Sequence, residues 1–72
     1  MSNIPSIKPE DVAKILIALG YILVRQRGSH QIYNKGDSII VVPMHNKDMK
    51  KGTLNQIVKA TGLSIEEFLS YL

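Results

Sequence analysis

Three strand-like segments follow one another in the middle of this chain, and the connections between them are very short. Their residues are mainly β-branched, aromatic or long, as strands favour, and they occupy Tyr21–Arg27, His30–Tyr33 and Ser38–Val42. Only Gly28-Ser29 and then Asn34-Lys35-Gly36-Asp37 separate them. Connections this short join antiparallel neighbours, because a parallel pair needs a long crossover. The sequence therefore predicts a three-stranded antiparallel sheet, in which the last strand, closed by Pro43, is the best buried.

An amphipathic helix is predicted before the strands. Pro9 suits the first position of a helix, and Gly20 ends it. Between them apolar residues recur at the spacing of one buried stripe, namely Val12, Ile15, Leu16 and Leu19.

Two more helices are predicted after the strands. Thr53 and Gln56 have the spacing of a capping box, and the helix that they start is expected to end at Gly62. Its core face consists of Leu54, Ile57 and Val58, with Leu63 close by. Ser64 and Glu67 form a second capping box, which predicts a short C-terminal helix with Ile65, Phe68, Leu69 and Leu72.

This order of elements indicates an α+β fold, α-β-β-β-α with a short C-terminal helix. Two amphipathic helices cover one face of the sheet and leave the other face open, which is the order found in double-stranded-RNA-binding domains. Residues 1–72 are expected to form a single domain. The chain has no cysteine and buries only about 60% of its unfolded surface at this size, so its stability depends on a small apolar core that includes Tyr33 and Phe68.

The positive charge of the chain is concentrated in its middle. The net charge is +3, and six cations but only two acids lie between Arg25 and Lys51. Such a distribution favours a polyanionic partner. The N-terminus lacks the pattern of a secretion signal, and no apolar stretch approaches the length of about 20 residues that a membrane span needs. A cytoplasmic protein that does not enter a membrane is expected.

His30 is the first candidate functional residue. It follows the Gly28-Ser29 turn, and Arg25 and Arg27 precede it. An imidazole transfers protons near neutral pH, and the two cations with the Ser29 hydroxyl can hold an anion beside it. A histidine at a turn is also often a structural hydrogen-bonding residue. Strand alternation alone does not decide whether His30 lies on the open face of the sheet.

A second group of candidates lies between the third strand and the next helix, namely His45, Lys47, Lys50 and Lys51. His45 is either a residue that fixes the loop or a second proton-transfer group or phosphate contact. The lysines precede a helix start, where free N–H groups and the helix dipole favour an anion. Double-stranded-RNA-binding domains place lysines at such a helix start against backbone phosphates. The alternative is a solvated run of charge.

Other chemistries fit the sequence poorly. Two histidines 15 residues apart, without cysteine, do not make a metal-ligand pattern. Ser29 beside His30 is not a hydrolase triad, because adjacent strand residues project to opposite faces. The glycines are spaced as turns and not as a nucleotide-binding loop. Neither a metal nor a cofactor is expected.

An ordered set of short motifs resembles the HicA family of bacterial toxins. The set is Gly20-Tyr21, Val24-Arg25, Gly28-Ser29-His30, Val42-Pro43-Met44-His45 and Lys51-Gly52-Thr53-Leu54, and the resemblance runs from about Lys8 to Leu63. It implies a fold similar to double-stranded-RNA-binding domains, endoribonuclease activity on messenger RNA, and inhibition by a HicB antitoxin. It also implies that His30 is the catalytic histidine and that His45 is the family's second histidine. The chain departs from the pattern only in continuing through Ser64–Leu72.

From the residues and the resemblance together we expect a metal-independent endoribonuclease. His30 is expected to act as general base on a ribose 2′-hydroxyl or as acid to the leaving 5′-oxygen. The expected RNA-binding residues are Arg25, Arg27, Ser29, Lys47, Lys50 and Lys51. A non-catalytic RNA-binding module and a pure interaction module are the alternatives.

Overall fold

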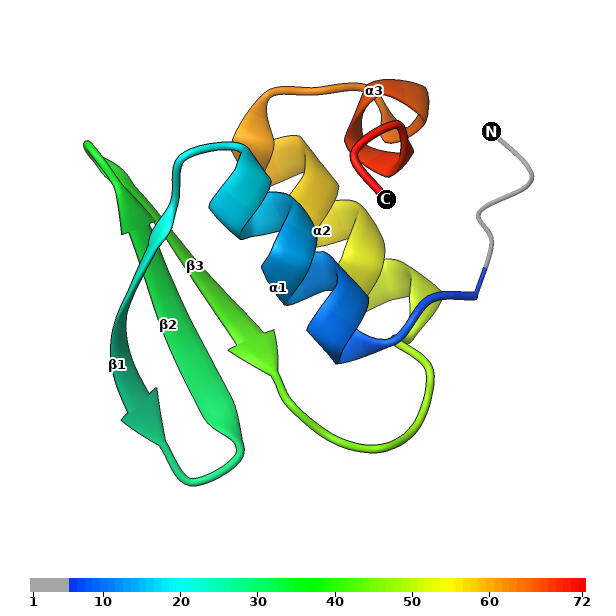
Figure 1. Cartoon of the computed structure of the whole chain (residues 1–72). Coiled ribbons are helices and arrows are strands. Elements are labelled where there is room, and N and C mark those ends of the chain that lie inside the picture. The colour runs from blue at the N-terminus through cyan, green and yellow to red at the C-terminus, as the bar shows by residue number, and fades with distance from the viewer. Residues whose placement is uncertain (1–5) are drawn as a thin grey trace.

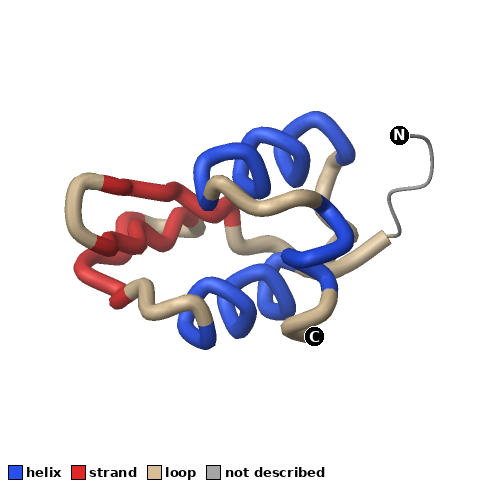
Figure 2. Tube along the Cα trace, turned by 90° about the horizontal axis from the view of Figure 1, so that it is seen from above, coloured by secondary structure: helices blue, strands red, loops and turns tan. Residues whose placement is uncertain are grey.

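The computed structural model describes residues 6–72 as three helices and one sheet. Its elements are α1 (Pro9–Ala18), β1 (Ile22–Arg27), β2 (His30–Lys35), β3 (Ser38–Pro43), α2 (Lys51–Thr61) and α3 (Ile65–Leu69). The strands are antiparallel in the order β1-β2-β3, and α1 and α2 cover the same face of the sheet (Figures 1 and 2). The predicted α+β architecture is confirmed. The N-terminal segment in which no secretion signal was found, residues 1–5, lies outside the described residues.

Both hairpins reverse through a two-residue turn that begins with glycine. Gly28 and Gly36 have φ angles of 57° and 58°, whereas no described residue other than glycine has a positive φ. A glycine with positive φ followed by an ordinary residue is the pattern of a type II′ turn, which matches the twist of the strands that it joins. The two turns therefore have the same geometry at opposite ends of β2.

The connection between β2 and β3 is shorter than predicted. Lys35 still pairs with Ser38, so the strand runs two residues beyond Tyr33 and only Gly36 and Asp37 form the turn. The Asn34 side chain explains this extension, since its amide nitrogen donates to the carbonyls of Gly36 and Ser38 at 3.1 and 3.2 Å.

The register of the strands assigns residues to the two faces of the sheet. Tyr33 is buried beneath the helices and pairs with Leu23 and Ile40. Since directly opposite residues share a face, these three lie on the covered face. β3 contributes two buried residues, Ile40 and Val42, whereas β2 contributes one and β1 none. The prediction that the third strand is the best buried is confirmed, although its alternate residues are exposed.

The core between the sheet and the helices contains most of the predicted residues. Val12, Ile15, Leu16, Leu54, Ile57, Val58, Tyr33 and Phe68 are all buried. Leu19, Ile65 and Leu69 pack against this cluster with partial exposure. Leu72 was also predicted on the core face of the last helix, but it is exposed, because α3 ends at Leu69.

The predicted start of α2, with Thr53 as its N-cap, is wrong by three residues. The helix begins at Lys51, with Lys50 as its N-cap and no side-chain hydrogen bond to the cap. The Leu54 N–H donates to the Lys50 carbonyl at 2.9 Å, which closes the first turn and places Thr53 inside it. The helix ends at Gly62 with a φ of 82°, as predicted. The capping box of Ser64 and Glu67 is also confirmed, with hydrogen bonds of 2.9 and 3.1 Å.

Candidate active site

His30 lies on the open face of the sheet, at one end. It is the first residue of β2 and is paired with Arg27 of β1 and Pro43 of β3. It alternates with the buried Tyr33, so its side chain projects away from the helices. The imidazole is exposed. The structure thus places His30 where a large substrate has access to it.

Arg25 and Arg27 share this face with His30. Arg27 stands directly opposite His30, and Arg25 stands opposite Ile32, the next residue of β2 on the same side. A shift of register between Leu23 and Arg25 allows this arrangement, since the extra residue in β1 lets Leu23 face the helices while both arginines face outward. The register brings together three of the predicted site residues.

The loop after β3 extends the site beyond the sheet. The Met44 N–H donates to the Ser29 carbonyl at 2.5 Å, so the start of the loop lies beside the turn that precedes His30. The loop and this turn lie at the same end of the molecule (Figure 1). At the other end of the loop, Met49 is buried and its N–H donates to the Ile7 carbonyl at 2.8 Å. Two backbone anchors therefore hold the segment that carries His45 and Lys47.

The cations of this end are left without ion pairs. The one ion pair found among residues 6–72 joins Lys8 to Asp48 at 3.5 Å, and Lys8 also donates to the Asn46 carbonyl at 3.3 Å. Asp48, the one acid of the loop, is therefore already paired with Lys8. The other cations at this end of the molecule form no ion pair within residues 6–72, namely Arg25, Arg27, Lys47, Lys50 and Lys51.

The ring of His45 is oriented by the backbone of its own loop. The Lys47 N–H donates to His45 Nδ1 at 3.3 Å. Because Nδ1 accepts this bond, the proton of the neutral ring is on Nε2. His45 also lines a hollow of about 270 Å³ with Pro43, Met49, Lys50 and Thr53. His45 therefore presents an N–H donor near the start of α2.

The N-terminus of α2 combines features that oppose helix formation in isolation. Its cap, Lys50, forms no side-chain bond to the helix, and its first turn contains Lys51 but no acid. The positive end of the helix dipole disfavours cations there, and the first N–H groups have no partner within the helix. A bound anion would relieve both unfavourable terms.

Ser29 contributes through its backbone rather than its hydroxyl. Its carbonyl accepts the bond from Met44, whereas its hydroxyl forms no hydrogen bond within residues 6–72. The structure therefore gives Ser29 a positioning role in the turn, and its predicted contact with RNA stays a prediction.

Two glutamines that sequence reasoning did not select support the turn from the covered side. Tyr33 donates its hydroxyl to Gln31 Oε1 at 2.7 Å. Gln31 donates to Gln26 at 3.4 Å, and Gln26 donates to the Gly28 carbonyl at 3.5 Å. This chain of bonds connects the core to the turn before His30. The one sign of this chain of bonds in the sequence was that Gln31 follows His30 in the strand, which places the two side chains on opposite faces.

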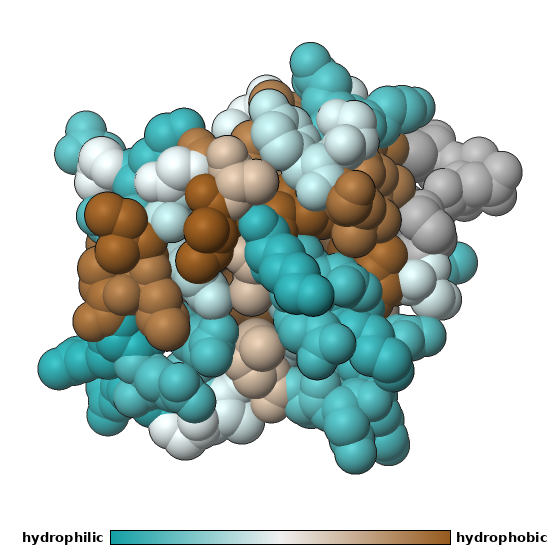
Figure 3. Space-filling view, viewed as in Figure 1, coloured by the Kyte–Doolittle hydropathy of each residue, from teal (hydrophilic) through white to brown (hydrophobic). Residues whose placement is uncertain are grey.

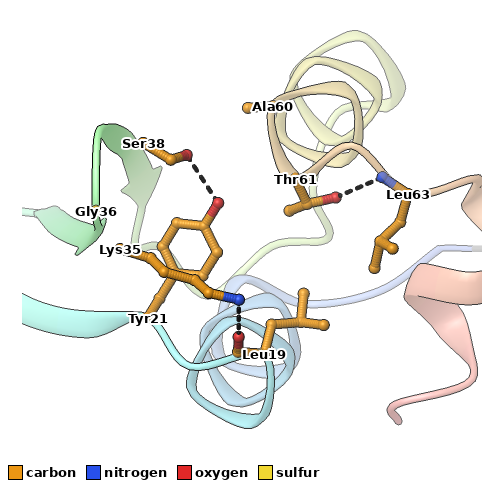
Figure 4. Close-up of a pocket in the computed structure, with 8 residues that line it drawn as sticks. All are labelled: Leu19, Tyr21, Lys35, Gly36, Ser38, Ala60, Thr61 and Leu63. Carbon is orange, nitrogen blue, oxygen red and sulfur yellow. Dashed lines mark hydrogen bonds between the residues drawn. The ribbon is translucent and has the colours of Figure 1, made fainter.

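A larger hollow lies at the opposite end of the molecule. It has a volume of about 400 Å³ and lies between the end of α1, the β2–β3 turn and the end of α2. Figure 4 shows that its polar groups already bond to one another: Lys35 Nζ donates to the Leu19 carbonyl at 2.6 Å, and the hydroxyls of Tyr21 and Ser38 are 2.7 Å apart. These groups stabilise the fold, so we place the candidate site at the His30 end.

Neither a metal cluster nor a membrane-spanning helix occurs in the described part of the chain. Among residues 6–72 no three side chains of the types that bind metals lie close enough together to hold an ion. No helix of this part is long and apolar enough to cross a membrane.

The fold and the site together define a class of protein. A three-stranded antiparallel sheet with helices on one face makes the chain an α+β domain, and its open face carries an exposed histidine beside cations that form no ion pair within residues 6–72. The family model described as HicA toxin of bacterial toxin–antitoxin matches residues 9–63, so the chain belongs to the HicA toxin family. It is therefore a toxin component, and its system includes an antitoxin. No individual curated protein matches the chain.

Proposed function

We propose that this toxin is a metal-independent endoribonuclease that cleaves messenger RNA in the cytoplasm, with His30 as its catalytic residue and a HicB-type antitoxin as its inhibitor. The observation that carries the proposal is the position of His30, exposed on the open face of the sheet opposite Arg27. Membership of the HicA family supports the same activity.

The proposed reaction uses the 2′-hydroxyl of RNA as nucleophile. The hydroxyl loses its proton to a general base, its oxygen bonds to the neighbouring phosphorus, and the bond to the 5′-oxygen breaks as that oxygen gains a proton. His30 acts as the base in this step or as the acid that protonates the leaving oxygen. A positioned proton-transfer group contributes about 10²–10⁴ in rate.

The cations around His30 are proposed to hold the phosphate backbone. Arg27 is nearest along the register, and Arg25 follows on the same face. Fixed positive charge beside the reacting phosphate stabilises the charge that develops on its oxygens. The same charge repels a divalent cation, which supports a mechanism without a metal ion.

The lysines and His45 are proposed to bind phosphates next to the cleaved one. The uncapped N-terminus of α2 attracts an anion, and Lys50 and Lys51 add charge at that point. Because its Nδ1 accepts from Lys47, His45 offers Nε2–H to a phosphate oxygen. We therefore assign His45 to phosphate binding, while His30 transfers the proton.

The decisive test compares two synthetic RNAs that differ in a single 2′-hydroxyl at the cleavage site. The purified wild-type protein should cleave the all-ribose strand in EDTA and leave a 2′,3′-cyclic phosphate or a 3′-phosphate with a 5′-hydroxyl. It should not cleave the 2′-deoxy strand there. Normal cleavage of the deoxy strand excludes the mechanism. Binding without cleavage would support the non-catalytic RNA-binding module instead, and neither binding nor cleavage would support a pure interaction module.

A further inference from the structure

The two edges of the sheet differ in how they are protected against pairing with another strand. At the β1 edge, the register shift between Leu23 and Arg25 interrupts the ladder, and Arg25 and Arg27 add charge. Bulges and charges are the usual means of blocking an exposed edge. β3, Ser38–Pro43, has neither, because it contains no charged residue and its register to β2 is continuous.

The backbone groups at the β3 edge can be assigned from the hairpin geometry. In a two-residue hairpin the residues that flank the turn, here Lys35 and Ser38, form a hydrogen-bonded pair, and such pairs then alternate along the ladder. The Met44 N–H bond to the Ser29 carbonyl continues this alternation. The N–H and C=O groups of Ile39 and Val41 therefore point away from β2. Within residues 6–72 no hydrogen-bond partner of these four groups is found.

A groove runs along the same edge. It has a volume of about 250 Å³ and lies between Ile39–Val41 of β3 and one side of α2, where it is lined by Thr53, Gln56, Ile57 and Ala60. The side chains of Ile39 and Val41 are 66% and 46% exposed on the open face. An added strand would gain backbone bonds from β3, aliphatic contacts on one face and the groove on the other.

The exposed aliphatic residues are not confined to β3. β1 also exposes Ile22, Leu23 and Val24, and Figure 3 shows hydrophobic surface in brown over this part of the sheet. The backbone of β1 is interrupted at this point by its register shift. Of the two edge strands, β3 is therefore the one that offers both an aliphatic surface and a regular row of free backbone groups.

We propose that the antitoxin of this system binds by adding a strand to the free edge of β3. This inference rests on the toxin role and on the proposed antitoxin. Strand addition uses main-chain bonds for affinity and alternate side chains for specificity. The uncharged edge requires a neutral, aliphatic strand beside Ile39 and Val41. Beyond Pro43 the chain presents Lys47, Lys50 and Lys51, so the partner's strand should be followed there by carboxylates.

A second copy of this chain fits the edge less well. Two copies each carry a net charge of +3 and repel one another. A copy that approached by its own β3 would also bring its own α2 toward the groove that α2 of the first copy already borders. An antitoxin strand meets neither obstacle. Since His30 and Pro43 are paired, a strand bound along β3 ends beside the proposed catalytic residue.

The edge is tested by a pair of variants at Val41, in full-length protein that carries His30→Ala to remove toxicity. Val41→Pro deletes the outward N–H and is compatible with an edge position, whereas Val41→Thr keeps the N–H and the branched shape. Proline should weaken binding of the purified cognate antitoxin at least ~100-fold, which corresponds to about 2.8 kcal/mol. Threonine should change it by less than ~3-fold, about 0.7 kcal/mol. Equal binding by both variants overturns the proposal.

Amide hydrogen exchange tests the same edge without a substitution in it. In the His30→Ala protein the amides of Ile39 and Val41 should exchange rapidly when free and at least ~100-fold more slowly in the complex, because exchange requires a broken hydrogen bond. The Gln26 amide, which points outward at the β1 edge, serves as control and should not change. Unprotected Ile39 and Val41 in the complex, or protection that grows with concentration of the free chain, contradicts an antitoxin strand. Because no RNA is cleaved in these assays, failure of the proposed nuclease activity would leave their result unaffected.

Discussion

His30 and Pro43 face each other at the last pair of the β2–β3 ladder. The pairing fixes the backbone of the candidate catalytic residue on a regular strand, which positions a side chain more accurately than a loop does. It also brings the loop with His45 and Lys47 out of the sheet beside His30. The positions of His30 and of the candidate phosphate-binding residues in the loop are therefore both set by the neighbouring ends of β2 and β3.

The two turn glycines, Gly28 and Gly36, provide a matched test of whether the turn before His30 positions that residue for cleavage. An alanine at Gly28 or Gly36 meets no atom within 4 Å, so the cost comes from the positive φ alone, about 1–3 kcal/mol for a residue with a Cβ. Both Gly28→Ala and Gly36→Ala should lower the free energy of unfolding by similar amounts in urea denaturation. Only Gly28→Ala should also lower RNA cleavage by the folded protein, because its turn precedes His30.

Gly52→Ala is the control for these variants. Gly52 lies in α2 and is not among the glycines with positive φ, so alanine there should raise stability by up to about 1 kcal/mol. If Gly36→Ala reduced cleavage as much as Gly28→Ala, the effect would come from general destabilisation and not from the position of the turn.

The lysines at the start of α2 should bind RNA without reading its sequence. Removing one lysine–phosphate interaction lowers the slope of log affinity against log salt by about 0.7 on single strands and about 0.9 on duplexes. Replacing Lys47, Lys50 and Lys51 with alanine should therefore weaken RNA binding strongly at low salt and leave site preference unchanged. The measurement is a salt titration in the His30→Ala protein. Lys59→Ala, at the other end of α2, should not alter the slope, and an unchanged slope in the triple variant would mean that these lysines are solvated.

The buried Tyr33 should make the protein less stable in alkaline solution. Burial raises the pKa of Tyr33 above its ordinary value of 10.0. Above that pH the unfolded chain loses the phenol proton while the folded chain still keeps it, so stability falls as pH rises. The stability that the protonated Tyr33 phenol contributes is complete below about pH 10 and is lost as the pH rises through the pKa of the folded state. Urea denaturation at several alkaline pH values should show this fall in the wild type and a smaller fall in Tyr33→Phe.

The control for this prediction is Tyr71→Phe, because Tyr71 is 46% exposed. The stability of this variant should fall with rising pH as much as that of the wild type. If Tyr33→Phe also followed the wild type, burial of the phenol would not be the cause.

Local signals in the sequence predicted most of the fold. The spacing of Val12, Ile15 and Leu16, the glycine turns and the Ser64 capping box each depend on neighbours within a few residues, and each is confirmed. The start of α2 was predicted wrongly because Thr53 resembles a cap, whereas the bond from Leu54 to the Lys50 carbonyl closes an earlier turn. A pattern of capping residues in the sequence does not show which backbone hydrogen bonds form.

The site was less predictable than the fold. The sequence selected His30 and the cations around it, but the face of the sheet that His30 occupies depends on its pairing with Arg27 and Pro43. The register shift in β1 and the ion pair of Lys8 with Asp48 depend on contacts between distant residues, and no local pattern encodes them. Catalysis by His30 stays a prediction.

His30 is proposed to transfer a proton during RNA cleavage. The direct measurement is the rate of RNA cleavage by purified wild-type and His30→Ala proteins, with thermal unfolding of both as a check of folding. Since His30 is exposed, its replacement should change the free energy of unfolding by no more than about 0.5 kcal/mol. The cleavage rate of the folded variant should be lower than that of the wild type by about 10²–10⁴. Cleavage at the wild-type rate by folded His30→Ala would contradict this proposal.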